Sequence, residues 1–356
     1  MNSFTRGLRN RNPLVLVLAA LLLAPALLGV QGWFTSGAWS AVPMERWVRT
    51  STDDYMVVSW LVGRLKQDPP ETPLVVLLGG SSGREAVVSG PSLARDIEAR
   101  GGPRVTARNL SSRMQRYAQS WAIVDNLPDT PTTVLIGVNL GRFTTSPASN
   151  YNQVVGRELL LKSDSLRRWV HDYSGEHAHS YTILPGIFSA LTSYVQQREN
   201  DLLVKGRLRP RSYRPHPFDT RKALSEEEKH KFVDKWLTTY YPRFRKVHEF
   251  DAHMLEGLVA EAKGRGLDVV LVDLPWNRAI VGDAFDEPMG VYQALTEDIA
   301  AKYEVPYLDF NRDVEIPSEY FLDLSHLLPP GRAIWQAGLA ERLARLYADG
   351  VLRTGS

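Results

Sequence analysis

The sequence predicts an α/β fold: a three-layer parallel sheet with helices on both faces, preceded by one N-terminal transmembrane helix. Three observations carry this prediction. Short apolar runs rich in β-branched residues recur along the chain, and two of them end in glycine. Stretches of helical periodicity separate these runs, which is the pattern of right-handed βαβ crossovers. An uncharged apolar run also stands near the N-terminus, at residues 13–30.

Composition excludes several classes of protein. Of the 356 residues, 44% are hydrophobic and 23% are charged, which is enough to bury a core and unlike a disordered polymer or a coiled-coil rod. The net charge of +2 argues against recognition of nucleic acid through a basic field, so no nucleic-acid partner is expected. The absence of cysteine excludes thiolate nucleophiles, disulfides and Cys-ligated metals, and we expect neither a metal nor another cofactor.

The N-terminus predicts a membrane anchor at residues 1–34. Residues 1–12 carry three arginines and no acid, and the apolar run 13–30 follows them. A helix rises about 1.5 Å per residue and needs roughly 20 residues to cross the hydrocarbon core. Arginines tend to stay in the cytoplasm, so we expect a single pass through the inner membrane with the remaining chain outside. A cleavable signal peptide is the alternative, because small residues at 24–26 and 38–41 offer cleavage sites.

The strands and helices of the α/β domain follow from periodicity. The apolar, β-branched runs predict five strands at residues 74–78, 105–108, 132–136, 267–272 and 305–310. The main helical patterns lie at residues 115–127, 250–265, 292–303 and 332–347.

Domain boundaries follow from these elements. We expect a juxtamembrane linker at 35–73, one α/β domain at 74–347 and a C-terminal tail at 348–356. The stretch between the third and fourth strands is far longer than one crossover needs. Residues 149–245 are therefore predicted to form a helical cap inserted in the domain, with helical stretches at 154–173, 183–203 and 225–236.

A glycine- and serine-rich motif follows the first strand. Residues 79–85 read GGSSGRE, at the strand end where open α/β sheets place their ligands. A serine in this position can expose its hydroxyl, and the glycines let a substrate approach the backbone closely. A plain turn and a phosphate-binding loop are the alternatives. No lysine follows in P-loop register and no G-x-G-x-x-G is present, which disfavours a nucleotide.

Two further motifs lie beside predicted element boundaries. Asn139 follows the third strand, where its amide could donate to a developing oxyanion or simply cap the next turn. Asp323 stands three residues before His326 in a predicted loop. A carboxylate so placed can orient an imidazole, which is then free to take a proton from a serine. The three motifs together predict nucleophilic catalysis more strongly than any one alone.

The combination resembles the SGNH hydrolases, also called GDSL-type esterases, whose sheet is flavodoxin-like. Their first block, G-D-S-x-x-R in many members, is similar to GGSSGR here, with Gly80 where aspartate is commonest. The resemblance implies that Ser81 is the nucleophile, with Ser82 as the fallback if the register shifts by one.

The later blocks assign the remaining site residues. The G-x-N block is similar to Gly137 to Asn139, which makes Asn139 an oxyanion donor. Gly137 is expected to keep the backbone open there, and Gly80 and Gly137 are candidates for the substrate-binding region. The D-x-x-H block makes His326 the base and Asp323 its orienting partner. The second block begins with an Asn and has a glycine soon after; here Ser111 and its neighbours follow Asn109 and the glycine is missing. Ser111 is kept as a candidate for the oxyanion and substrate region, and the second oxyanion donor stays open.

The resemblance implies a serine esterase or O-acyltransferase that works through an acyl-enzyme. Water as acceptor makes it an esterase and a hydroxyl makes it a transferase; the sequence leaves both open. Membrane-tethered relatives of this layout look like proteins that modify envelope polymers, such as alginate acetylation and D-alanyl transfer proteins. The expected partner is an acylated, most simply acetylated, envelope glycan or polymer, with a membrane acyl-donor protein as a further candidate. The alternative is a non-catalytic binding or scaffold protein on the same fold.

Two other segments have open interpretations. Residues 205–222 carry many bases, three prolines and a single acid, Asp219. They are either a contact for anionic headgroups or an acidic polymer, or a solvated loop. The aromatic residues between Trp236 and Phe244 either stack against a glycan or pack in the core.

Overall fold

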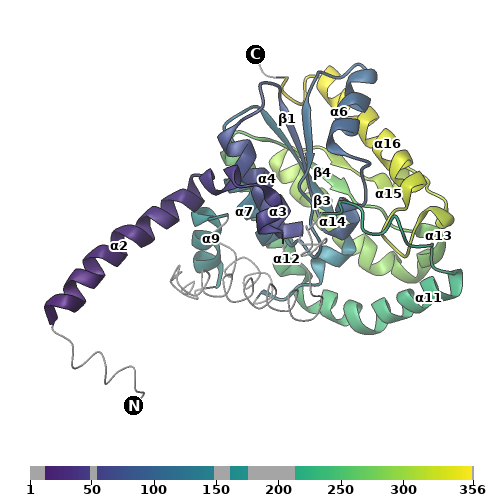
Figure 1. Cartoon of the computed structure of the whole chain (residues 1–356). Coiled ribbons are helices and arrows are strands. Elements are labelled where there is room, and N and C mark those ends of the chain that lie inside the picture. The colour runs from purple at the N-terminus through teal and green to yellow at the C-terminus, as the bar shows by residue number, and fades with distance from the viewer. Residues whose placement is uncertain (1–12, 49–53, 148–160, 175–212, 355–356) are drawn as a thin grey trace, which may run out of the picture.

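The computed structural model describes residues 13–48, 54–147, 161–174 and 213–354 (Figure 1). The described residues contain a five-stranded, all-parallel sheet in the order β2-β1-β3-β4-β5, which confirms the predicted α/β class. Its strands are β1 (Leu74–Leu78), β2 (Thr106–Asn109), β3 (Thr132–Val138), β4 (Asp268–Asp273) and β5 (Tyr307–Leu308).

The strands form where continuous apolar runs were predicted. Every residue of β1 and β3 is buried, as expected for interior strands of a parallel sheet. Leu74, the first residue of β1, is paired with Thr106 of β2 and with Thr132 of β3. The fifth strand is shorter than predicted, because Pro306 precedes it without an N–H to donate and the edge pairs over two residues only.

Alternate residues of β1 enter two different apolar clusters. Leu74, Val76 and Leu78 belong to one, and Val75 and Leu77 belong to the other. The first cluster includes side chains of α4 (Asp54–Gln67), α7 (Tyr117–Asp125), α12 (Tyr241–Gly264) and α14 (Asp286–Tyr303). The second includes side chains of α6 (Gly90–Ala99) and α16 (Pro329–Ala348).

Helix α4 lies in the stretch that the sequence analysis treats as a linker. Val58 and Val62 are buried on α4, in the same cluster as the core side chains of β1. The segment before β1 is therefore part of the packed domain and not merely a connection to the anchor.

Helix α12 begins earlier than the predicted residue 250. It starts at Tyr241, with Pro242 in its first turn, a position that proline favours because the missing N–H has no helical partner there. Helices α14 and α16 likewise begin a few residues before their predicted starts, whereas α7 is shorter than predicted. Short helices connect the larger elements: η1 (Ala38–Ala41), α3 (Met44–Trp47), α5 (Ser81–Arg84), η2 (Leu140–Phe143), α13 (Arg278–Val281), η4 (Gly282–Phe285), α15 (Phe310–Asp313) and η5 (Ser318–Tyr320).

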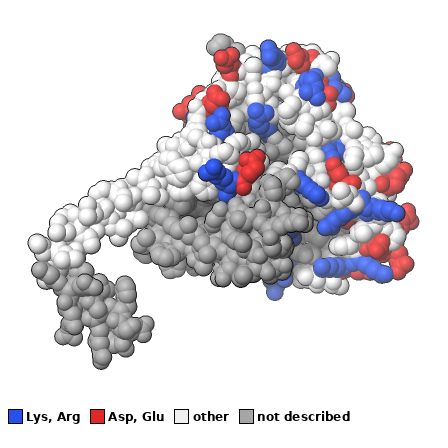
Figure 2. Space-filling view, in the orientation of Figure 1, with Lys and Arg blue, Asp and Glu red and all other residues white. Residues whose placement is uncertain are grey.

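Helix α2 (Pro13–Thr35) is long and apolar enough to cross a membrane, by length and composition. It projects away from the α/β domain in Figure 1. Figure 2 shows no charged side chain along it, while acidic and basic side chains are spread over the domain. A signal sequence near the N-terminus meets the same criteria, so length and composition alone do not distinguish an anchor from a signal.

The long connection between β3 and β4 contains α9 (Asp164–Ser174), α11 (Glu226–Lys235) and the π-helical turn η3 (Trp236–Tyr240) that leads into α12. The predicted helical stretch 183–203 and the first part of the stretch 154–173 lie outside the described residues. Helix α11 matches the stretch 225–236 and starts at a capping box formed by Ser225 and Glu228.

Candidate active site

Three predicted site residues meet at the carboxyl end of β1. Ser81 is the first residue of α5, directly after the strand and Gly80. The Oγ atom of Ser81 lies 2.8 Å from Nε2 of His326. The other ring nitrogen of His326, Nδ1, lies 2.9 Å from Oδ1 and 2.8 Å from Oδ2 of Asp323. The structure thus joins serine, imidazole and carboxylate in one hydrogen-bonded chain.

The loop that carries His326 is held by its own backbone. Asp323 Oδ1 accepts the N–H groups of Ser325 at 2.9 Å and of His326 at 3.1 Å. The N–H of Leu322 donates to the carbonyl oxygen of His326 at 2.8 Å. The spacing of three residues therefore lets one carboxylate bind both the backbone and the side chain of the histidine.

Asp323 is held as a carboxylate. Burial alone raises the pKa of Asp323, but the hydrogen bond from His326 and the two backbone N–H donors outweigh it and leave that pKa below its usual range. A carboxylate accepts only, so Nδ1 of His326 carries the proton in this pair. Nε2 is then available to accept the Ser81 hydroxyl proton.

Asn139 contacts α5 through a hydrogen bond to Ser82, the alternative nucleophile. Its Nδ2 donates to Ser82 Oγ at 2.8 Å, and its Oδ1 accepts the N–H of Arg142 at 3.1 Å. The capping interpretation of this asparagine is therefore confirmed, because its side chain caps η2, and its role as an oxyanion donor stays a prediction. Ser82 is 3% exposed and bonded to Asn139, whereas Ser81 is the serine bonded to His326.

The two predicted glycines have different surroundings. A Cβ at Gly80 would meet no atom within 4 Å, so the space beside Ser81 is open. A Cβ at Gly137 would lie 2.8–2.9 Å from side-chain carbons of Leu274. Gly137 therefore makes room for Leu274, a packing role that differs from the expected approach of a substrate.

Ser111 packs beneath α5. It is 2% exposed, its Oγ donates to the carbonyl oxygen of Leu77 at 3.3 Å, and its N–H donates to Asn109 Oδ1 at 3.0 Å. A Cβ at Gly83 would lie 2.8 Å from Ser111 Oγ, so the glycine allows α5 to approach this serine. In this arrangement Asn109 already uses the backbone donor of Ser111.

A network of buried charges follows the nucleophile motif. Arg84 is bound by Asp54 at 2.5 Å and by Glu85 at 3.0 Å, and Arg332 binds the second oxygen of Glu85 at 2.9 Å. All four side chains are almost fully buried. Buried charges persist only when they are paired, so these contacts tie α5 to α4 and α16.

The sequence analysis assigned no role to this network. Arg84 and Glu85 stand within the quoted motif, and two adjacent charges a few residues after a buried strand were the available signal. Asp54 and Arg332 lie far away in the sequence and gave no signal.

Phe218 is a further residue that sequence reasoning missed. Its ring lies 4.9 Å from the ring of His326, at an interplanar angle of 80°. It belongs to the basic segment 205–222, of which residues 205–212 lie outside the described part of the chain. No pattern in the sequence connects this segment with the histidine loop.

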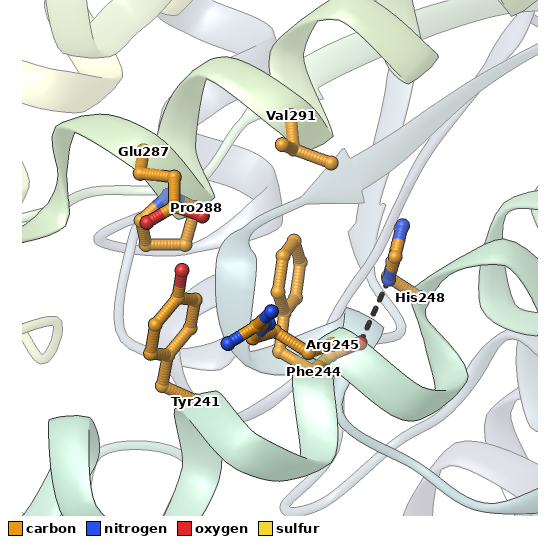
Figure 3. A pocket seen from close by; sticks show the side chains of 7 residues that line it. All are labelled: Tyr241, Phe244, Arg245, His248, Glu287, Pro288 and Val291. Atoms are coloured by element: carbon orange, nitrogen blue, oxygen red, sulfur yellow. Dashed lines mark hydrogen bonds between the residues drawn. The ribbon is translucent and has the colours of Figure 1, made fainter.

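A shallow pocket of about 140 Å³ lies between α12 and α14 (Figure 3). Phe244 forms part of its lining, and His248 Nδ1 bonds to the carbonyl oxygen of Phe244 at 2.8 Å. Tyr241 points toward Glu287 across the pocket. None of the three hydrogen-bonded site residues lines it. Trp236 and Phe244 are buried, as the core-packing interpretation of this aromatic run expects.

Within the described ranges no group of three His, Asp or Glu side chains is placed to hold a metal ion. In comparisons with known proteins, the sequence matches no family model and no curated protein. The functional assignment therefore depends on the geometry of the site.

Proposed function

We propose that this chain is a membrane-anchored serine esterase or O-acyltransferase of the SGNH type, acting on an acylated, most simply acetylated, glycan or polymer of the cell envelope. The observation that carries the proposal is the hydrogen-bonded chain from Ser81 through His326 to Asp323. A serine hydroxyl is a weak nucleophile, and this arrangement is the one that activates it.

In the first half-reaction, Ser81 Oγ attacks the ester carbonyl carbon while His326 Nε2 takes its proton. The carboxylate of Asp323 stabilises the imidazolium that forms. Collapse of the tetrahedral intermediate breaks the ester bond, and His326 returns the proton to the leaving alcohol. The acyl group is then held as an ester on Ser81.

The negative oxygen of the intermediate needs donors. The N–H groups of the first residues of α5 have no partner within the helix, which leaves that of Ser81 for this role. The Asn139 amide, now on Ser82, is the second proposed donor after a small rotation. One such donor is typically worth about 3–4 kcal/mol of barrier.

In the second half-reaction, His326 removes a proton from the acceptor, whose oxygen attacks the carbonyl carbon of the acyl-enzyme. Collapse of this intermediate breaks the bond between the acyl group and Ser81 Oγ, and His326 returns the proton to Ser81. Water as the acceptor yields a free acid, and a sugar or polymer hydroxyl yields a new ester. Each step uses side chains of this chain, so the proposal needs neither a metal nor another cofactor.

The proposal extends to architecture and location. Helices on both sides of the parallel sheet would form three layers, with residues 149–245 as a helical cap. Helix α2 would be a single inner-membrane span, with the arginines of residues 1–12 inside and the α/β domain outside. An envelope polymer would then be within reach, and a membrane partner could supply the acyl donor. The likeness to envelope-modifying proteins is the basis for this substrate class.

The test uses the full chain in detergent, with Ser81→Ala and, as matched control, Ser82→Ala. Each protein is treated with p-nitrophenyl acetate and with a serine-reactive phosphonate, and the adduct is located by peptide mass spectrometry. We expect turnover and an adduct on Ser81 in the wild type and in Ser82→Ala, and neither in Ser81→Ala. An adduct on Ser82 would move the nucleophile by one residue.

The second candidate is a non-catalytic binding or scaffold protein for envelope polymers. Two observations favour it: Gly80 replaces the aspartate that is commonest in the first block, and the N–H of Ser111 is already bound by Asn109. A wild-type chain without turnover and without a phosphonate adduct, toward acetylated polymers as well as p-nitrophenyl acetate, would support this candidate.

A further inference from the structure

The segment Tyr213–Leu224, which we call the strap, lies across the catalytic edge of the domain. It comes from the long connection between β3 and β4, far from the site in sequence. Its last residue, Leu224, donates its N–H to Leu322 of the histidine loop at 2.9 Å. Asp219 in its middle accepts from Arg332 of α16 at 2.9 Å. The strap is thus fixed to two elements that adjoin the site.

The strap is also fixed beside the nucleophile helix. Nδ1 of His216 lies 3.3 Å from Glu85 Oε2, and Nε2 lies 3.0 Å from the carbonyl oxygen of Val88. Glu85 directly follows α5 and is fully buried. His216 and Asp219, on the two sides of Phe218, are therefore bound to the charged network that includes Glu85 and Arg332.

Phe218 stands between these fixed points, with its ring held by cations. The guanidinium of Arg84 lies 5.4 Å from the ring centroid, and that of Arg221 lies 4.9 Å from it. A guanidinium over an aromatic ring is attracted by the negative charge of the ring face. Arg84 is itself buried and paired with two carboxylates, so it provides a rigid contact for the ring.

The contact of Phe218 with His326 restrains tilting of the imidazole about the line through its two ring nitrogens, a motion that the hydrogen bonds do not restrain. Ser81 and Asp323 bind the two ring nitrogens, which fixes the ring along the line between them. Tilting about that line is opposed by packing, and Phe218 packs nearly perpendicular to the imidazole. Both His326 and Asp323 have side chains only about one-fifth exposed, at 18% and 20%.

We infer that Phe218 is a positioning residue of the proposed acyl-transfer reaction, holding the His326 imidazole in line between Asp323 and Ser81. The inference rests on the proposed function. It predicts that the loss of the ring lowers the rate of chemistry and barely changes the binding of a small ester. A misplacement of about 1 Å can cost up to about a hundredfold in rate.

The experiment compares Phe218→Ala and Phe218→Tyr in the full chain, with Phe232→Ala as the matched control. Phe232 is 43% exposed on α11 of the same connection. With p-nitrophenyl acetate, we expect Phe218→Ala to lower kcat about tenfold with KM within about twofold, and Phe218→Tyr to restore most of kcat. The rate of phosphonate labelling of Ser81 should fall with kcat. Unchanged kcat and labelling in Phe218→Ala would overturn the inference.

A second readout separates this inference from the proposed function. Diethyl pyrocarbonate modifies accessible imidazole nitrogens, and peptide mass spectrometry reports the rate at His326 without any need for turnover. We expect faster modification of His326 in Phe218→Ala than in the wild type or in Phe232→Ala. If the wild type shows neither turnover nor a phosphonate adduct, the proposed function fails, and the modification rate of His326 still tests the inference: an increase in Phe218→Ala supports the strap contact, and an unchanged rate overturns it.

Discussion

Replacing Glu85 with glutamine should destabilise the fold by removing one charge from the buried network behind the nucleophile. The Glu85 carboxylate is 0% exposed and accepts from Arg84 at 3.0 Å and from Arg332 at 2.9 Å. Glutamine keeps the size of the side chain. It replaces one acceptor oxygen with an NH₂ group, which would face a guanidinium donor.

The size of the effect follows from the partners that remain. Removal of one partner of a buried ion pair typically costs about 3–5 kcal/mol. Arg84 keeps Asp54, and Arg332 keeps Asp219, so we expect the lower end of that range, about 3 kcal/mol. For a domain of roughly 150–250 residues each kcal/mol lowers Tm by about 2–4 °C, which corresponds to a fall of roughly 6–12 °C.

The assay is thermal unfolding of the full chain in detergent, followed by circular dichroism. Glu341→Gln is the matched control, because Glu341 forms a surface pair with Arg345 at 3.1 Å and its side chain is 61% exposed. Surface pairs contribute at most about 1 kcal/mol. If Glu85→Gln melts no lower than Glu341→Gln, the buried network does not stabilise the domain and the reasoning is refuted.

Two further substitutions test packing and pH dependence. Gly137→Ala places a Cβ 2.8 Å from Leu274 and should lower the free energy of unfolding, measured in urea, by about 1–3 kcal/mol. Gly80→Ala is the control, because its Cβ meets no atom within 4 Å, and it should change that free energy by at most about 0.5 kcal/mol. Equal losses in the two variants would contradict this prediction. Burial, reinforced by Asp309, raises the pKa of Asp273 well above its usual range. A carboxyl group whose pKa is raised in the folded state makes the fold less stable as the pH rises above its pKa in the unfolded chain, about 3.9. Asp273→Asn should therefore raise Tm at neutral pH and leave Tm unchanged below a pH of about 3.9. A lower Tm of the variant at neutral pH would contradict this prediction.

Much of the sheet could be predicted from the sequence because strand formation depends on near neighbours. Continuous β-branched runs such as those of β1 and β3 identify buried strands without knowledge of their partners. Helix α4 was missed because it lies between the anchor and the first strand. Its apolar residues are buried only once α4 packs against the core side chains of β1.

The candidate site likewise combines a local feature that the sequence predicts with contacts that depend on the packing of distant elements. Asp323 and His326 are three residues apart, so their pairing is a local property of one loop. The resemblance of the motif favours Ser81 over Ser82 as the nucleophile, and Ser81 is the serine bonded to His326 in the structure. The difference depends on α5, which turns the Ser82 hydroxyl toward Asn139.

The class of fold, the order of the strands along the chain and the three motifs beside element boundaries follow from local patterns of residues. These properties arise from residue types that act over a few positions: continuous apolar runs, glycine at turns, and a carboxylate close to a histidine. The folded arrangement alone reveals the sheet order, the pairing of Glu85 with Arg332, and the contact of Phe218 with His326. Contacts between distant segments depend on how whole helices and strands pack. A local sequence pattern does not specify which distant side chain will pack against a given residue.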